Sequence, residues 1–192
     1  MTSQPTLILV AGGPGAGKTA FGRALAMGLS ATILVDKDVL ASPWIDPVLA
    51  RLHDGQVDRD SDVYWTFVRP LEYASMMALA LDNLALGKSA VVVAPFGREL
   101  RDGGWLDACR SEASRVAARL QVIWLDTSAD VARDRMTRRA DIRDRWKLEH
   151  WNEFAQTDPY AKPPGDALIL HNAPDTRIED LVDRALKWLG PQ

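Results

Sequence analysis

Residues 12–19 are Gly12, Gly13, Pro14, Gly15, Ala16, Gly17, Lys18 and Thr19, and they match the pattern G-x-x-x-x-G-K-[ST] in full. The run from Leu7 to Val10 before them is short and apolar, which is typical of a buried strand. Ala20 to Leu29 after them has apolar residues at helical spacing. A strand, a glycine loop and a helix in this order predict a phosphate-binding loop.

The residue types of this loop suit a nucleoside triphosphate. Glycine allows positive φ and a close approach of the backbone, so successive N–H groups can surround a β-phosphate at the positive end of the following helix. Lys18 is expected to place its charge at the β- and γ-phosphates, and the Thr19 hydroxyl is expected to bind Mg²⁺. We therefore expect residues 12–19 to bind nucleotide, with Thr19 as a metal ligand.

The bulk composition predicts one α/β domain over residues 1–192. The chain is 47% hydrophobic and 26% charged, which is ordinary for a globular protein. Its net charge of -3 provides no general attraction to nucleic acid or to an anionic membrane. The single Cys109 cannot form an internal disulfide, and the first residues lack a basic segment followed by a leader-like apolar run. These features favour a cytoplasmic protein with no membrane partner.

Short apolar runs alternate with longer helical patterns, as in a parallel sheet covered by helices on both faces. The expected strands are Thr6–Ala11, Thr32–Val35, Ala90–Ala94, Gln121–Leu125 and Ala167–Leu170. The expected helices include Ala20–Leu29, Glu72–Leu86 and Ile178–Leu189, with a short helix and a loop within Ser42–Ser61 and a connection over Thr157–Gly165. Ligands of such sheets bind at the carboxyl ends of the strands.

Two carboxylates follow the second expected strand. Asp36 and Asp38 are separated by Lys37, and they are expected to face the γ-phosphate across the ligand cleft. We interpret Asp38 as the base that accepts the proton of an acceptor hydroxyl, and Asp36 as a residue near the metal and the acceptor. The alternative is that both aspartates cap the next helix, and for Asp36 the two interpretations stay open.

The phosphate loop, the Asp36-x-Asp38 pair and an arginine-rich segment after the fourth strand resemble the small P-loop kinases. That group includes shikimate kinase, gluconate kinase, chloramphenicol phosphotransferase and the kinase domain of polynucleotide kinase. The resemblance spans nearly the whole chain and implies a three-layer α/β P-loop NTPase fold, with a five-stranded parallel sheet and an arginine-rich lid. It also implies an ATP-dependent kinase that uses Mg²⁺ and phosphorylates a hydroxyl of a small molecule, with Asp38 as the base.

The lid is expected over about residues 133–156. Its first part, Arg133 to Lys147, is rich in arginine, and a guanidinium group can hold phosphate oxygens through two hydrogen bonds. Most of these arginines are expected to pair with nearby aspartates on a helix surface. We select Arg139 and Arg143 as the residues that act on the transferred phosphate.

Two features concern the metal and the acceptor. The family commonly places an aspartate at the end of the third strand, but Val93, Ala94 and Pro95 stand there, so metal binding depends more on Thr19 and Asp36. Arg98 lies just beyond and is expected to contact the acceptor, with a surface salt bridge as the alternative. Trp44 and Trp65 could either line an acceptor pocket or belong to the core.

Two other functions are compatible with these residues. A nucleic-acid 5′-hydroxyl kinase would use the same catalytic groups, although the acidic balance counts against it and Ala41 replaces an arginine found after the aspartate pair in polynucleotide kinases. A regulatory module that binds nucleotide and hydrolyses it slowly is the second alternative. The sequence lacks the Asn-Lys-x-Asp guanine reader of switch GTPases.

Overall fold

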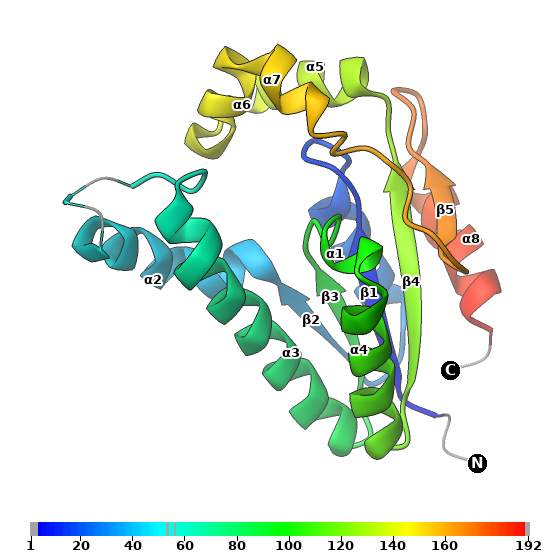
Figure 1. Cartoon of the computed structure of the whole chain (residues 1–192). Coiled ribbons are helices and arrows are strands. Elements are labelled where there is room, and N and C mark those ends of the chain that lie inside the picture. The colour runs from blue at the N-terminus through cyan, green and yellow to red at the C-terminus, as the bar shows by residue number, and fades with distance from the viewer. Residues whose placement is uncertain (1–3, 53, 56, 191–192) are drawn as a thin grey trace.

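A five-stranded parallel sheet with the order β2-β3-β1-β4-β5 forms the centre of the protein in the computed structural model, which describes residues 4–52, 54–55 and 57–190 (Figure 1). Its strands are β1 (Thr6–Ala11), β2 (Thr32–Asp36), β3 (Ser89–Val93), β4 (Arg119–Asp126) and β5 (Leu168–His171). The predicted α/β fold class is confirmed, and each strand begins and ends within two residues of its expected position.

Helices cover both faces of the sheet, with α3 and α4 on one face and α1 and α8 on the other (Figure 1). The helices are α1 (Lys18–Gly28), α2 (Lys37–Leu52), α3 (Arg69–Ala85), α4 (Gly103–Arg115), α5 (Ala129–Arg139), α6 (Arg145–Glu149), α7 (Trp151–Gln156) and α8 (Ile178–Leu189). A π-helical segment, Tyr64–Val68, leads into α3. None of the described helices has the length and apolar composition that crossing a lipid bilayer requires.

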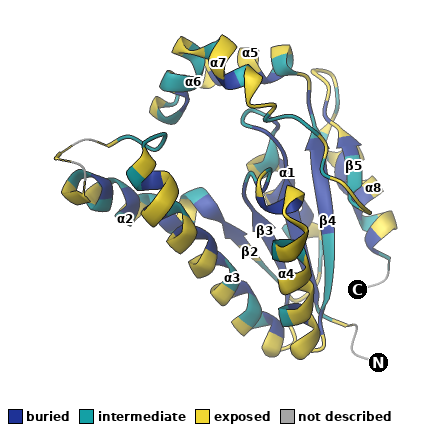
Figure 2. Ribbon diagram, viewed as in Figure 1, coloured by how far each residue is buried: buried dark blue, intermediate teal, exposed yellow. Residues whose placement is uncertain are grey.

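The apolar sequence of β1 follows from its position between the two helical layers. All of its residues are buried, as the dark blue strands of Figure 2 show. Leu7 and Leu9 pack on the side of α3 and α4, whereas Ile8 and Val10 pack on the side of α1 and α8. A strand with two covered faces needs apolar residues at every position, and this continuous signal made β1 easy to predict.

The segment after β2 differs from the expectation. A short helix was expected within Ser42–Ser61, but α2 begins earlier, at Lys37, and continues through Pro43 and Pro47. Its buried face consists of Ala41, Ile45 and Leu49, which pack with Tyr64 and Val68. Burial of a large apolar side chain contributes about 1.5–3 kcal/mol. This burial offsets much of the roughly 3 kcal/mol that an interior proline costs a helix.

The close packing of α1 on the sheet predicts an unusual response to alanine at Gly22. A Cβ atom at residue 22 would lie 2.4 Å from Cγ2 of Val93, although alanine favours a helix more than glycine does. We expect Gly22→Ala to lower the free energy of unfolding by about 1–3 kcal/mol in urea denaturation, because the buried strand cannot move away.

Gly28 of the same helix is the matched control. A Cβ atom there would lie 3.4 Å from Cδ1 of Leu186 and 3.9 Å from Cδ2 of Leu186 and Cγ1 of Val182, which are ordinary van der Waals distances. Gly28→Ala is therefore expected to leave the stability unchanged or to raise it by up to about 1 kcal/mol. Equal stability of the two variants would contradict the packing argument.

Candidate active site

A cleft of about 520 Å³ lies at the carboxyl ends of β1, β2 and β3, within the size range of small-molecule sites. The helices α5, α6 and α7 lie at the end of the sheet toward which the strands point (Figure 1). The structure brings the residues selected from the sequence together at this cleft, namely Lys18, Thr19, Asp36, Asp38, Arg98, Arg139 and Arg143. Gly12, Gly13, Pro14, Gly15 and Gly17 line it as well. Ala16 instead packs its side chain into the core between the sheet and α1.

The phosphate loop has the backbone geometry that its glycines permit. Gly15 and Gly17 have φ values of 74° and 88°, which side chains strongly disfavour. A Cβ atom at residue 17 would also lie 2.6 Å from Nδ2 of Asn172. Gly17 is the N-cap of α1, and no side chain caps this helix. The first N–H groups of α1 are thus available to an anion, as the prediction of a phosphate loop requires.

Lys18 is folded back over the loop. Its Nζ donates a hydrogen bond to the carbonyl oxygen of Gly13 at 2.8 Å. Burial lowers the pKa of Lys18 to about 8, against the opposing attraction of Asp38. The ammonium group therefore lacks a strong counter-charge in the protein alone, and a triphosphate would supply one.

Two residues that the sequence reasoning did not select hold the phosphate loop from outside. Asn172 donates from Nδ2 to the carbonyl oxygen of Ala16 at 2.8 Å, and the Tyr160 hydroxyl donates to that of Pro14 at 3.1 Å. Asn172 follows β5 directly, so the rule that site residues follow strand ends could have found it. No sequence signal marks Tyr160, because it lies in the irregular connection before β5.

The two carboxylate oxygens of Asp36 have different surroundings. Its Oδ1 accepts a hydrogen bond from the N–H of Asp38 at 2.9 Å, so one oxygen caps the start of α2. Its Oδ2 is buried and has no hydrogen-bond partner among the described residues. A buried, unpartnered carboxylate oxygen beside the phosphate loop fits the oxygen ligands that Mg²⁺ prefers.

Asp38 lies between two cations. Its Oδ1 is 3.3 Å from Nζ of Lys37, and its Oδ2 is 2.6 Å from Nη1 of Arg143. Burial raises the pKa of the Asp38 carboxyl, but the charges of Lys37 and Arg143 outweigh burial and hold it below its usual value. Asp38 is therefore ionised at neutral pH and can accept a proton.

A buried network behind Asp38 was not predicted from the sequence. Glu72 of α3 is fully buried, and its Oε1 lies 3.1 Å from Nζ of Lys37. Its Oε2 accepts a hydrogen bond from the Tyr64 hydroxyl at 2.7 Å. Burial and the Glu72 carboxylate both raise the pKa of Tyr64, which keeps the phenol protonated as the donor. Glu72 thus fixes Lys37, and Lys37 in turn contacts the proposed base.

Part of the arginine-rich segment has its partners outside the cleft. Arg138 pairs with Asp134, and Arg135 bonds to the carbonyl oxygen of Ala173. The cleft is instead lined by Arg139, Arg143 and Lys147.

These cleft-lining cations have carboxylate partners. Arg139 bonds to the buried Asp144, and Arg143 joins Asp38 to Asp141. Lys147 lies 3.3 Å from Asp60 and connects this segment to the chain before α3.

The acceptor-side candidates have different positions. The Arg98 guanidinium lies over the ring of Trp65, 4.5 Å from its centroid, and both residues line the cleft. No carboxylate lies within ion-pair distance of Arg98 among the described residues, so the salt-bridge alternative is not realised there. Trp44 is partly buried, packs against the buried face of α2 and does not line the cleft. Asp126, at the end of β4, pairs with Lys162 and His171.

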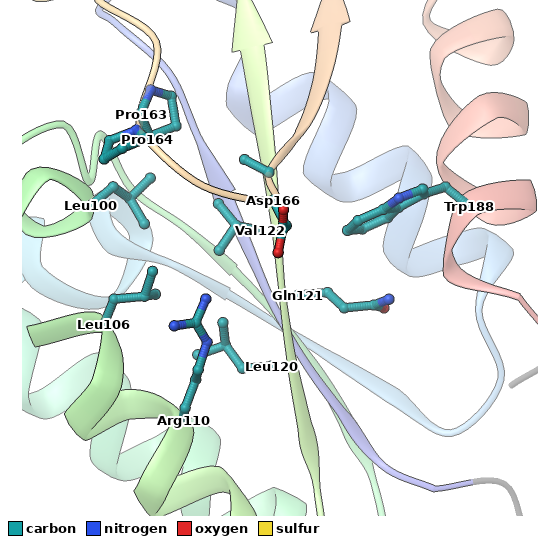
Figure 3. A pocket seen from close by; sticks show the side chains of 11 residues that line it. Leu100, Leu106, Arg110, Leu120, Gln121, Val122, Pro163, Pro164, Asp166 and Trp188 are labelled. Atoms are coloured by element: carbon teal, nitrogen blue, oxygen red, sulfur yellow. The ribbon is translucent and has the colours of Figure 1, made fainter. Parts of the chain in front are cut away.

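A second cavity of about 310 Å³ lies beside the first half of β4 (Figure 3). Leu106 and Arg110 of α4 line one side and Trp188 of α8 lines another, while Pro163 and Pro164 lie at its upper end. This cavity is distant from the phosphate loop in the fold, because β4 reaches the loop with its opposite end. It contributes nothing to the candidate active site.

Comparisons with known proteins agree with this geometry. The family model AAA_33, described as an AAA domain, matches residues 7–158. The chain therefore belongs to the AAA_33 family. The comparison with curated proteins gives no match.

Solved structures similar to this AAA_33 protein share its fold. A sugar kinase from Janibacter sp. HTCC2649 is 19% identical, with 97% of this chain and 95% of that chain covered and a TM-score of 0.63. A gluconokinase from Sinorhizobium meliloti 1021 is 20% identical, with 97% and 92% covered and a TM-score of 0.58. The Mycobacterium tuberculosis APS kinase CysC, in complex with AMPPNP and APS, is 17% identical, with 97% and 98% covered and a TM-score of 0.57.

The lowered pKa of Lys18 predicts pH-dependent nucleotide binding by the AAA_33 protein. Above pH 8 the free protein loses the Lys18 proton, so binding of MgATP must restore that proton. We expect the dissociation constant to be flat from about pH 6.5 to 7.5 and to rise by up to about tenfold per pH unit above 8.

Calorimetry at pH 9 in buffers of different ionisation enthalpy should show proton uptake on MgATP binding. Lys18→Ala is the control, and it should bind weakly without this pH dependence. Unchanged affinity and no proton uptake at pH 9 in the parent would contradict the assignment of Lys18.

The buried network predicts a large loss of stability on removal of its charge. Glu72→Gln leaves the Lys37 ammonium buried without its main counter-charge, and we expect a loss of about 3–5 kcal/mol in urea denaturation. Tyr64→Phe should cost about 1–3 kcal/mol, because Oε2 of Glu72 loses its donor.

The control is Glu112→Gln, which removes an exposed ion pair with Arg115 on α4. Its effect should stay within about 1 kcal/mol. A Glu72→Gln variant as stable as this control would show that the buried pair does not hold the α2 and α3 segments in place.

Proposed function

We propose that this protein is an ATP-dependent kinase that transfers the γ-phosphate to a hydroxyl group of a small molecule. The observation that carries the proposal is the position of Asp38, an ionised carboxylate at the carboxyl end of β2, in the same cleft as Lys18 of the phosphate loop. Phosphoryl transfer needs little more from a base than a positioned carboxylate, because the acceptor loses its proton late. The names of the similar solved structures, a sugar kinase, a gluconokinase and an APS kinase, support the same class of reaction.

The phosphate end of the cleft would bind the triphosphate through residues 12–19. Gly15 and Gly17 bring the backbone close to the phosphates, and the free N–H groups at the start of α1 point toward them. Lys18 would exchange its bond to Gly13 for the β- and γ-phosphate oxygens. In this exchange the phosphate oxygens become the charge partner of Lys18, which has no close carboxylate in the protein.

The residues present fit a magnesium ion. Thr19 and the unpartnered Oδ2 of Asp36 would hold it, and Mg²⁺ so bound would neutralise charge on the phosphate oxygens. The third strand adds no carboxylate, since Val93, Ala94 and Pro95 line that wall. No group of three His, Cys, Asp or Glu residues that could hold a metal occurs in the described part of the chain. The remaining ligands would be phosphate oxygens and water, as is usual for Mg²⁺.

The chemical step follows from the positions of the acid and basic groups. The acceptor oxygen forms a bond to the γ-phosphorus, the bond from that phosphorus to the β–γ bridging oxygen breaks, and the hydroxyl proton passes to Asp38. Arg143 already contacts Asp38, so its guanidinium lies where it can move onto the transferred phosphate. Arg139, on the same side of the cleft, would add a second positive charge.

The 5′-hydroxyl kinase alternative is less well supported. Position 41, where polynucleotide kinases have an arginine, is occupied here by Ala41, which is fully buried against Ile45 and Leu49 on the inner face of α2. A side chain at this position points into the core and away from the cleft. The regulatory-module alternative would leave the ionised Asp38 without a chemical role.

The central prediction is that Asp38→Asn abolishes transfer but not nucleotide binding. We expect acceptor-stimulated ADP release to fall by about 10²–10⁴-fold, because the amide cannot take the hydroxyl proton. ADP release should be measured with a panel of candidate acceptors that covers sugars, hydroxy acids, nucleosides and antibiotics. The affinity for MgATP is measured in parallel by calorimetry.

Asp126→Asn is the matched control, because Asp126 also lies at the carboxyl end of a strand but contacts Lys162 and His171 outside the cleft. This variant should retain turnover. Transfer at the parental rate by Asp38→Asn would rule out Asp38 as the base, and a parent without any stimulated turnover would favour the regulatory module.

A further inference from the structure

We propose that one wall of the cleft is an anion-binding subsite, and that the acceptor is a small alcohol bearing a carboxylate or phosphate group. The wall consists of Tyr73, Arg69, Trp65 and Arg98, and we call it the arginine–aromatic wall. This inference rests on the proposed kinase function and names the substrate class of the same site.

The arginine–aromatic wall is a stack in which rings and guanidinium groups alternate. Arg69 lies 4.1 Å from the ring centroid of Tyr73 and 5.0 Å from that of Trp65. Arg98 lies over Trp65 at 4.5 Å. All four side chains line the cleft. A guanidinium that stacks through its face keeps its N–H edge free, and that planar edge matches two oxygens of a carboxylate or phosphate.

Two cations on this side of the cleft have no carboxylate partner, although Nη1 of Arg101 donates a hydrogen bond to the carbonyl oxygen of Asp158 at 3.4 Å. Nine cationic residues line the cleft against four carboxylates, in a chain with a net charge of -3. Among the described residues, six of the nine have an ion-pair partner, and Lys18, Arg98 and Arg101 have none. The charge of Lys18 serves the triphosphate. Arg98 and Arg101 follow β3 and have no such role.

Arg69 differs from Arg98 because its charge is already compensated. It bonds to Glu99, and this bond and the surrounding rings fix its position. We therefore assign Arg69 as the residue that orients Trp65, and Arg98 as the residue whose free edge contacts the anion. Because Glu99 neutralises Arg69, Arg69 can position the neighbouring ring without adding net positive charge to the subsite.

The topology places this subsite next to the proposed base. β2 and β3 are neighbours in the sheet, and Asp36 pairs in register with Val93. Asp38 and Arg98 follow these two strand ends, so an acceptor can present its hydroxyl to Asp38 while its anionic group contacts Arg98. The cleft of about 520 Å³ must also hold the triphosphate, which restricts the acceptor to a small molecule.

The test compares acceptors that differ only in the anionic group. The pairs are gluconate with glucitol, and glycerate with glycerol. Glycerol 3-phosphate, compared with glycerol, tests the phosphate group, and a 5′-hydroxyl oligonucleotide tests a polymeric acceptor. Steady-state ADP release is measured for the parent, Arg98→Gln, Arg98→Lys and the exposed control Arg115→Gln. Calorimetric titration of the same compounds, with a non-hydrolysable ATP analogue bound, gives a readout that does not need turnover.

We expect the parent to prefer an anionic acceptor over its neutral twin by about tenfold or more in kcat/KM. Arg98→Gln should remove this preference by raising the KM of the anionic acceptor, and it should leave the affinity for MgATP unchanged. Arg98→Lys should keep part of the preference, because lysine retains the positive charge. Arg115→Gln should match the parent. A carboxylate or phosphate preference identifies the group.

Three results would overturn the subsite. The first is equal kcat/KM for neutral and anionic twins, and the second is an Arg98→Gln effect of the same size on both. The third is phosphorylation of the oligonucleotide alone. If no compound is phosphorylated, the proposed kinase function fails, and calorimetry alone then tests the anion-binding subsite. The subsite is overturned if no anionic compound binds more tightly than its neutral twin.

Discussion

The ion pair between Glu72 and Lys37 is the constraint on which the proposed acceptor side of the cleft depends. Glu72 is fully buried in α3, and Lys37 is the first residue of α2. A buried carboxylate is tolerated only with a charged partner and further hydrogen bonds, which Lys37 and Tyr64 supply. Because each group needs the others, α2, α3 and the end of β2 form one unit. That unit fixes Asp38 relative to the phosphate loop.

The cleft therefore has two ends with different physical bases. The phosphate end is made of backbone, with left-handed glycines and free N–H groups that need no particular side chain beyond Lys18 and Thr19. The proposed acceptor end is made of side chains from several segments, held by stacking and ion pairs. A family can thus keep the first end constant while the second changes, which is how one fold serves several acceptors.

The features of the fold and the site that could be predicted from the sequence are those marked by short, continuous patterns in the chain. The phosphate loop and β1 were found because their signals are continuous in the chain, and Asp36 and Asp38 because they follow a strand. Glu72 and Tyr160 were missed because their partners are distant in sequence: 35 residues separate Glu72 from Lys37, and 146 separate Tyr160 from Pro14. The length of α2 was underestimated because prolines are strong local signals, whereas its packing partners come from the following segment.

The contact between Arg143 and Asp38 has a consequence for how this site can evolve. Each of the two groups is the charge partner of the other, so a change in either one alters the environment of both. Single substitutions at the two positions are then non-additive, and only a double-mutant cycle separates their contributions. A related protein that has lost either Arg143 or Asp38 gains little by keeping the other residue. We therefore expect the two residues to be retained or lost together.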